Sequence, residues 1–122
     1  MTSSAPRAVG PYSQAVRAGD YVFVSGQIPV DPATGTMLDG DIAAQTRRVI
    51  LNVEAILAAA GASLGDVVCT TVFLANMDDF PAMNEAYSGF FAPPAPARST
   101  VEAARLPKNA RLEIDVIAYL GR

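Results

Sequence analysis

Apolar and polar residues alternate along the first quarter of the chain, which is typical of β-strands with one buried face. Over residues 14–27 ("QAVRAGDYVFVSGQ") the alternation predicts two short strands that turn at 18–20. Gly26 and Pro29 are expected to end the second strand. Asp-Pro and Thr-Gly pairs in the following segment, 30–40, predict a loop rich in turns.

Two later segments repeat their apolar residues at helical spacing. Over residues 41–60 apolar side chains recur every three or four positions, and Gly61 follows where a helix C-cap glycine belongs. A second helix is expected over 78–91, with Asp78 as its N-cap. Pro81 falls in the first turn of this helix, where its missing N–H costs little.

The remaining segments predict three more strands. Residues 66–74 ("DVVCTTVFL") form an unbroken apolar and β-branched run, which indicates a central strand covered on both faces. Residues 97–120 predict two strands joined by a Pro-Lys-Asn turn, and the last strand alternates strictly. The element order β-β-α-β-α-β-β describes an α+β fold with two helices on one mixed sheet, in a single domain over residues 1–122.

Composition restricts the partners of the chain. Its 122 residues are 51% hydrophobic and only 17% charged, so we expect another copy of the chain to cover part of its apolar surface. The net charge of -3 and the lack of basic runs argue against nucleic acid. Because there is no long apolar run and no signal-peptide core, we expect no membrane contact and a cytoplasmic protein. The single cysteine, Cys69, is expected to be a buried free thiol.

The chain contains no histidine, which restricts its chemistry further. This absence removes Ser-His-Asp and Cys-His catalysis and the usual nitrogen ligands of zinc, copper and iron. No glycine pattern for phosphate binding is present either, so no nucleotide is expected. The sequence therefore predicts neither a metal nor an organic cofactor, and leaves Arg, Glu, Asp, Tyr and Ser side chains, backbone amides and water to carry any reaction.

Charged residues at two strands are the first candidates for chemistry. Arg98 begins a strand, with Thr100 on the same face, and its planar guanidinium matches a carboxylate; a structural salt bridge is the commoner role of such a residue. Glu113 and Asp115 share a face of the last strand, where each raises the pKa of the other and one could accept a proton. A solvated strand face explains that pair equally.

Hydroxyl and amide side chains form a second set of candidates. Tyr12 follows a Gly-Pro turn and Ser25 ends a strand, so both hydroxyls could point into a cleft, although such residues often only form turns. Asn84 and Tyr87 on the second helix are ambiguous, and Tyr87 is expected to serve packing.

Five segments together resemble the Rid family of reactive-intermediate deaminases, also called the YjgF family. They are "GPYSQAV", "YVFVSGQIPVDPATG", "AAQTRRVILNVEAILAAAG", "TTVFLANMDDFPAMNEAY" and "PARSTVEAARLPKNARLEIDVIA". The similarity runs from Val9 to Ala118 in the order of the family, and its most specific parts are "PARS" and "ARLP".

The resemblance implies a chorismate-mutase-like fold, a homotrimer with sites between subunits, and hydrolysis of 2-imino acids, of the 2-iminobutanoate or 2-iminopropanoate type, to 2-oxo acids and ammonia. It implies that Arg98 binds the substrate carboxylate and that Glu113 positions the attacking water. Tyr12 and Ser25 would then line the site, and Tyr12 would take part in catalysis.

The resemblance also assigns supporting residues and leaves two other functions open. Asn84 and Gly26 join the expected substrate-binding set. So does Thr100, where many members have cysteine and where the contact could come from the backbone amide. A trimer that only binds a 2-oxo acid would look the same in sequence, and some relatives carry an endoribonuclease label.

Overall fold

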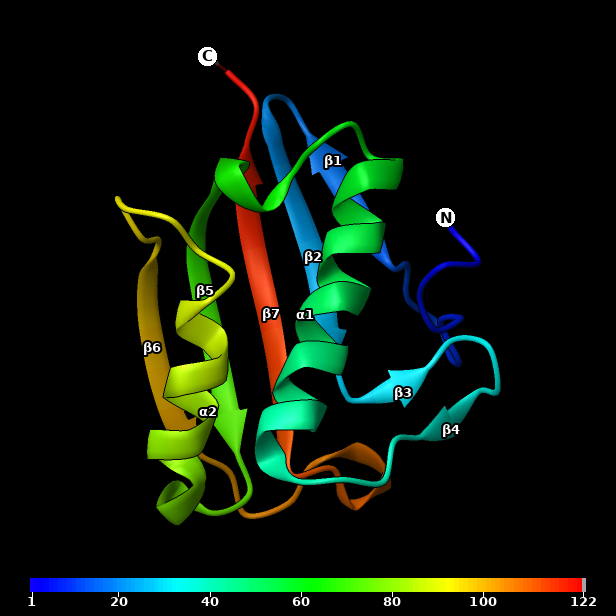
Figure 1. The fold of residues 1–122 in the computed structure, drawn as a ribbon. Coiled ribbons are helices and arrows are strands. Elements are labelled where there is room, and N and C mark those ends of the chain that lie inside the picture. Colours follow the sequence, from blue (N-terminus) through cyan, green and yellow to red (C-terminus); the bar gives the residue numbers. More distant parts are fainter. Residues whose placement is uncertain (122) are drawn as a thin grey trace.

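A five-stranded sheet with two helices on one face dominates the computed structural model, which describes residues 1–121 (Figure 1). The helices are α1 (Ile42–Ala59) and α2 (Phe80–Ser88). In spatial order the strands are β1 (Ala15–Ala18), β2 (Tyr21–Gln27), β7 (Leu112–Tyr119), β5 (Val67–Leu74) and β6 (Ala97–Glu102). Because β5 and β6 run parallel and the other neighbours antiparallel, the sheet is mixed, and the predicted α+β fold is confirmed.

Short elements fill the connections between these strands and helices. A small hairpin of β3 (Val30–Asp31) and β4 (Thr36–Met37) occupies the segment that was expected to be a loop. Single 3-10 turns η1 (Leu64–Asp66), η2 (Met77–Asp79) and η3 (Pro107–Asn109) precede β5, α2 and β7. Gly26 was expected to end strand β2. The strand instead passes through a β-bulge there and pairs again with β7 at Gln27.

Helix α1 begins at an N-cap that was not predicted and ends at the predicted glycine. The carboxylate of Asp41 accepts a hydrogen bond from the backbone N–H of Ala44 at 2.8 Å, which makes Asp41 the N-cap. At the other end Gly61 has φ of +81°, a left-handed conformation that favours glycine. The apolar stripe between these ends packs on the sheet over β2 and β7.

The second helix is shorter than predicted. Asp78 lies in η2, where its backbone N–H donates a hydrogen bond to the side-chain oxygen of Asn76. Asp79 directly precedes α2. The carboxylate of Asp79 binds Arg111 at 2.9 Å instead of capping the helix. Pro81 lies in the first turn, as expected, and α2 ends at Ser88 rather than at Phe91.

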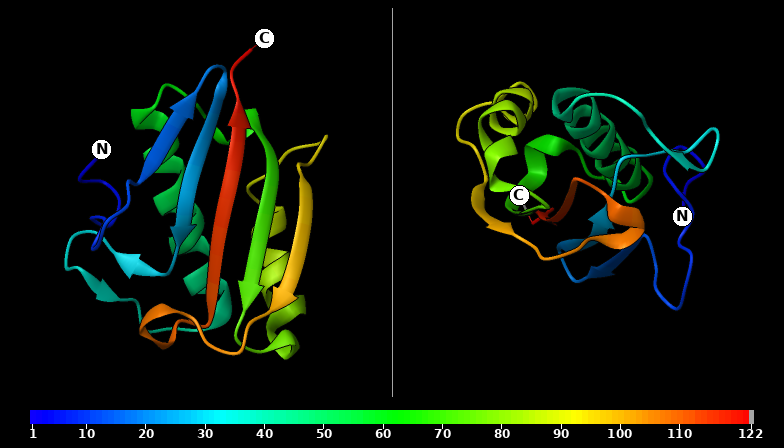
Figure 2. Two further views of the ribbon diagram at one scale, coloured as in Figure 1. Left: turned by 180° about the vertical axis from the view of Figure 1, so that it is seen from behind. Right: turned by 90° about the horizontal axis from the view of Figure 1, so that it is seen from below.

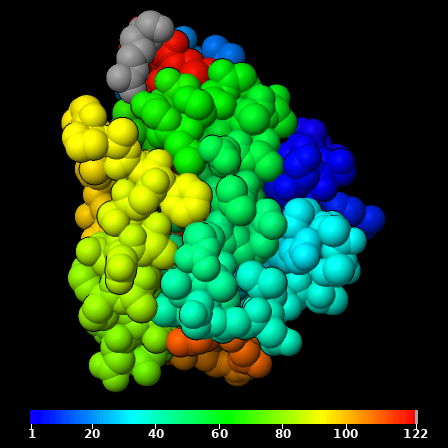
Figure 3. All heavy atoms as spheres, in the orientation of Figure 1, coloured from blue at the N-terminus to red at the C-terminus, as the bar shows by residue number. Residues whose placement is uncertain are grey.

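The two faces of the sheet differ in character. Under the helices the side chains of β2, β5 and β7 are almost wholly buried, and Figure 3 shows the helices as a continuous layer over this face. The opposite face, called the open face below, carries no helix (Figure 2). Strand β5 is interior, but it is covered on one face only, so the prediction of two covered faces is wrong for the single chain. Cys69 points to the open face and is half-buried, which corrects the expected buried thiol.

Within residues 1–121, none of the helices has the length and apolar character needed to cross a membrane.

Candidate functional site

Arg98 lies on an edge strand, β6, with its side chain on the face covered by α2. Its register partner on β5 is Thr70, which is buried beneath that helix. The guanidinium carbon lies 4.7 Å from the centre of the Tyr87 ring and 5.5 Å from that of Phe80. The single ion pair within residues 1–121 joins Arg111 to Asp79, so Arg98 has no acidic partner there, and the structural salt bridge considered from the sequence is absent from this part of the chain.

Two predicted site residues share the surroundings of Arg98. Asn84 is four residues after Phe80 and three before Tyr87 on α2, so it belongs to the same side of the helix as both rings. Thr100 is two residues beyond Arg98 on β6 and therefore shares its face. Arg98, Asn84 and Thr100 thus gather at the edge of the sheet, under α2.

Glu113 lies on the open face of β7, directly beside Gly26 in the bulge of β2. A Cβ placed on Gly26 would overlap the Glu113 carboxylate, with the carboxyl carbon at 2.8 Å. The absence of a side chain at position 26 is what allows β2 and this carboxylate to approach so closely. Asp115 follows on the same face, as the alternation of β7 predicted.

The environment raises the pKa of both carboxyl groups. Burial is the main cause for Glu113, and the neighbouring charge of Asp115 adds to it. For Asp115 burial again raises the pKa, while a hydrogen bond from Thr71 opposes the shift. Glu113 is therefore a better proton acceptor than an ordinary surface glutamate, which is the property expected of a group that deprotonates water.

Ser25 is fixed to the segment that follows the Gly-Pro turn. Its hydroxyl donates to the backbone carbonyl of Ser13 at 2.6 Å, and its N–H donates to the carbonyl of Gln14 at 2.9 Å. The Gln14 side chain is buried and bonds Thr2 through both its oxygen and its nitrogen, and its nitrogen also binds the carbonyl of Pro6. Gln14 thereby ties the N-terminal residues to the strand that carries Ser25.

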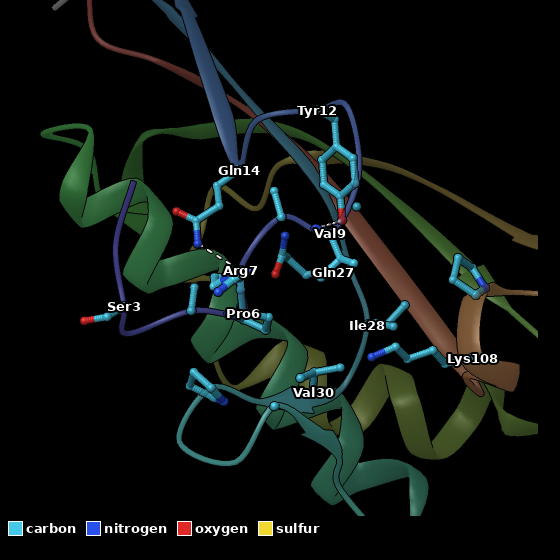
Figure 4. A pocket seen from close by; sticks show the side chains of 16 residues that line it. Ser3, Pro6, Arg7, Val9, Tyr12, Gln14, Gln27, Ile28, Val30 and Lys108 are labelled. Carbon is cyan, nitrogen blue, oxygen red and sulfur yellow. Dashed lines mark hydrogen bonds between the residues drawn. The ribbon is translucent and has the colours of Figure 1, made fainter.

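Tyr12 and Gly26 line one side of a hollow of about 520 Å³ between the N-terminal segment and the β3–β4 hairpin. Figure 4 shows the Tyr12 ring at one end of the hollow, Lys108 reaching toward it from η3, and the bond from Gln14 to Pro6 along its wall. The hollow is mostly apolar, with Arg7 and Lys108 as its two cations. Tyr12 itself is 54% exposed.

The predicted site residues therefore form two groups on one chain. The Arg98 group is Arg98, Asn84 and Thr100, and the Glu113 group is Glu113, Gly26, Ser25 and Tyr12. Across β5 the position opposite Arg98 is Val116, which is three residues from Glu113. With strands about 4.8 Å apart and a rise of about 3.3 Å per residue, the two Cα atoms are ~14 Å apart, and the side chains point to opposite faces. One small substrate cannot touch both groups of the same chain.

Comparison with known proteins gives the family of the chain. A family model described as "Endoribonuclease L-PSP" matches residues 2–120. A RutC family protein of Pyrococcus abyssi is 54% identical over 119 residues, which cover 98% of this chain and 94% of that protein. The chain belongs to the Rid (YjgF) family.

Other members of the Rid family carry more specific names. A 2-iminobutanoate/2-iminopropanoate deaminase of Salmonella typhimurium is 50% identical over 120 residues, covering 96% of this chain and 93% of that protein. The crystal structure of E. coli TdcF with bound serine has 48% identity and a TM-score of 0.93, and covers 98% of this chain and 95% of that one.

Sequence reasoning missed two residues at the candidate site of this Rid chain. Tyr87 was assigned to packing, yet its ring lies against Arg98 and its hydroxyl bonds Thr70 at 2.8 Å. Burial raises the pKa of Tyr87, so the phenol stays protonated as a hydrogen-bonding group. Gln14 was missed because nothing in the local pattern distinguishes a buried strand-entry amide from an exposed one.

Proposed function

We propose that this Rid chain hydrolyses 2-imino acids to 2-oxo acids and ammonia, at sites formed between copies of the chain. The observation that carries the proposal is the set of contacts that the Arg98 side chain makes. Its guanidinium lies against two aromatic rings and has no acidic partner within residues 1–121. A guanidinium held in this way can bind a carboxylate in two parallel hydrogen bonds. Supporting it, one close relative bears the name of such a deaminase and another was solved with serine, a small carboxylate.

The reaction suits the available groups. The carbon of a protonated imine is already electrophilic, so the enzyme needs to hold the carboxylate, place one water and accept a proton. Arg98 binds the carboxylate, and Glu113 takes a proton from the water as its oxygen bonds to the imine carbon. The carbinolamine then collapses: Glu113 returns the proton to the nitrogen and takes the proton of the hydroxyl group as the carbon–nitrogen bond breaks, so ammonia leaves and a 2-oxo acid remains. The released ammonia takes that proton from Glu113 and restores the carboxylate. Tyr12 and Ser25 orient the water or the leaving nitrogen.

Two copies are needed because Arg98 and Glu113 point to opposite faces of the sheet. The open face supplies a surface for association, since apolar side chains are well exposed across it: Val16, Tyr21, Phe23 and Val101. A patch of this kind on a small chain usually marks an interface. We assign the homotrimer of the family to this chain, with the Arg98 group of one copy completing the Glu113 group of the next.

The proposal is tested by generating 2-iminobutanoate in place with a threonine dehydratase and trapping unhydrolysed imine with semicarbazide. The parent protein is expected to lower the trapped fraction. Arg98→Ala should abolish this effect, and Arg105→Ala should not, because Arg105 is an exposed arginine that bonds only Asn109 within residues 1–121. If the parent left trapping unchanged, the deaminase proposal would fail for this imine.

Glu113→Gln separates catalysis from binding alone. The amide keeps the shape of the side chain but cannot accept the proton, so turnover should fall at least ~100-fold while 2-oxobutanoate still binds. A parent that binds 2-oxobutanoate without lowering imine trapping would instead be a small-carboxylate binding protein. Full turnover by Glu113→Gln in an intact oligomer would remove Glu113 from the mechanism.

A further inference from the structure

We infer that Tyr87, fixed by Thr70, is a positioning residue that holds the Arg98 guanidinium in the plane required for a carboxylate. The inference rests on the proposed role of Arg98 and adds the residues that orient it. Three contacts carry it: the ring of Tyr87 against Arg98, the bond from Tyr87 to Thr70, and the pairing of Thr70 with Arg98 across the β5–β6 register.

These contacts form a closed arrangement. The parallel register places Arg98 beside Thr70, and the hydroxyl of Thr70 lies 2.8 Å from that of Tyr87 in a buried setting. This bond fixes the depth of the ring between α2 and the sheet. The ring in turn lies 4.7 Å from the guanidinium carbon. Each member thus limits the freedom of the next.

A second aromatic ring, just beyond the end of α2, supports Tyr87. The ring of Phe91 lies 4.7 Å from that of Tyr87 at an interplanar angle of 35°. Phe91 belongs to the segment that connects α2 to β6, so the chain segment leading to Arg98 also braces the ring beneath it. Tyr87 is 6% exposed, which leaves it little room to move.

The contact of the Arg98 guanidinium carbon with the Tyr87 ring occupies no carboxylate, so the N–H groups of Arg98 stay available to a ligand. Stacking uses the π surface, whereas a carboxylate binds the in-plane N–H groups, so an aromatic platform can orient Arg98 without competing with substrate. An acidic side chain would also hold Arg98 in place, but it would occupy the same N–H groups. A ring therefore orients this arginine at less cost to substrate binding than an ion pair.

Four variants test the inference by binding of 2-oxobutanoate and by KM and kcat for imine hydrolysis. Tyr87→Leu removes the ring and should weaken 2-oxobutanoate about 2- to 30-fold and raise KM similarly, with kcat changed less. Tyr87→Phe and Thr70→Val keep the ring but lose its fixing bond, and each should produce a smaller rise. Phe90→Leu is the matched control, because Phe90 is a half-buried aromatic on the same core and, within residues 1–121, the rings that contact Arg98 are those of Phe80 and Tyr87.

The NMR signal of the Arg98 Nε–Hε group supplies a readout that does not depend on turnover. The aromatic ring at position 87 should shift this signal upfield and slow exchange of the Nε–Hε proton with water in the parent, in Tyr87→Phe and in Phe90→Leu. The signal is assigned by its absence from the spectrum of Arg98→Lys. Parent-like binding together with a signal that stays at the parent's upfield position in folded Tyr87→Leu would overturn the inference and leave the proposed function intact. If Tyr87→Leu does not fold, parent-like affinity in both Tyr87→Phe and Thr70→Val would overturn it. Unaltered 2-oxobutanoate binding by Arg98→Ala would instead refute the proposed function, whatever the NMR signal shows.

Discussion

Gly26→Ala should separate stability from activity, because the added methyl group meets a side chain and not the backbone. It would lie 2.8 Å from the carboxyl carbon of Glu113 and 3.0 Å from its Cγ, well inside the 3.5–4.0 Å of ordinary carbon contacts. Glu113 must therefore rotate away by about 1 Å. An off-rotamer side chain costs about 1 kcal/mol, and the reduced entropy of the unfolded chain partly offsets this cost. The free energy of unfolding should therefore change by no more than about 1 kcal/mol.

The effect on turnover should be much larger than the effect on stability. A reacting group misplaced by about 1 Å costs roughly 100-fold in rate, so kcat should fall by about that factor. Chemical denaturation and the semicarbazide assay measure the two effects on the same preparation, and size-exclusion chromatography checks the oligomer. Gly65→Ala is the matched control, because a Cβ there meets only the Ser63 hydroxyl at an ordinary 3.6 Å.

Two results would contradict this reasoning. A kcat within threefold of the parent would mean that Glu113 does not act from the position described beside Gly26. A loss of more than about 3 kcal/mol would mean that the methyl group disturbs the strand itself. A further check is the double variant Gly26→Ala/Glu113→Gln, in which the glycine change should cost little beyond Glu113→Gln alone, because both changes remove the same function.

Two further predictions concern pH and the N-terminal segment. Glu113 must be ionised to accept a proton, and its pKa is raised above the ordinary 4.5, so kcat/KM should fall as pH decreases through that raised pKa. Asp115→Asn removes the smaller of the two causes that raise the Glu113 pKa, and should move the acidic limb of the pH–rate profile to lower pH. An acidic limb that does not move would show that Asp115 has no influence on Glu113. Gln14→Leu removes the buried amide that bonds Thr2 and Pro6, and should lower the free energy of unfolding by about 1–3 kcal/mol. It should also speed backbone exchange over residues 2–6, as measured by hydrogen-exchange mass spectrometry. Parent-like exchange would mean that other contacts hold this segment.

The fold was predictable where local pattern and tertiary packing agree. The helical stripe of α1, the glycine at position 61 that follows it and the strict alternation of β7 are local signals, and each corresponds to its predicted element. The errors lie where one signal had two outcomes. Asp78 was expected to cap the second helix but lies in η2, and the carboxylate of Asp79, which directly precedes α2, binds Arg111, a partner distant in sequence. The apolar run of β5 suggested two covered faces, but a single chain covers only one of them.

The candidate site was less predictable, because its geometry depends on contacts across the sheet. The sequence could show that Glu113 and Asp115 share a face and that Arg98 and Thr100 share another. It could not show which faces coincide, since that requires the register through β5. The role of Tyr87 was equally hidden: a buried aromatic at helical spacing normally packs, and only the position of Arg98 gives it a second task.

The placement of Arg98 and Glu113 on opposite sides of one sheet has a genetic consequence. If each site draws one group from each of two neighbours, a defect in Arg98 and a defect in Glu113 damage different halves of the site. Two inactive alleles expressed together would then complement each other, because some mixed rings would contain a site built from two undamaged halves. A copy defective in both groups would do the opposite: it would disable two sites of any ring that it joins, and so act dominantly over intact copies.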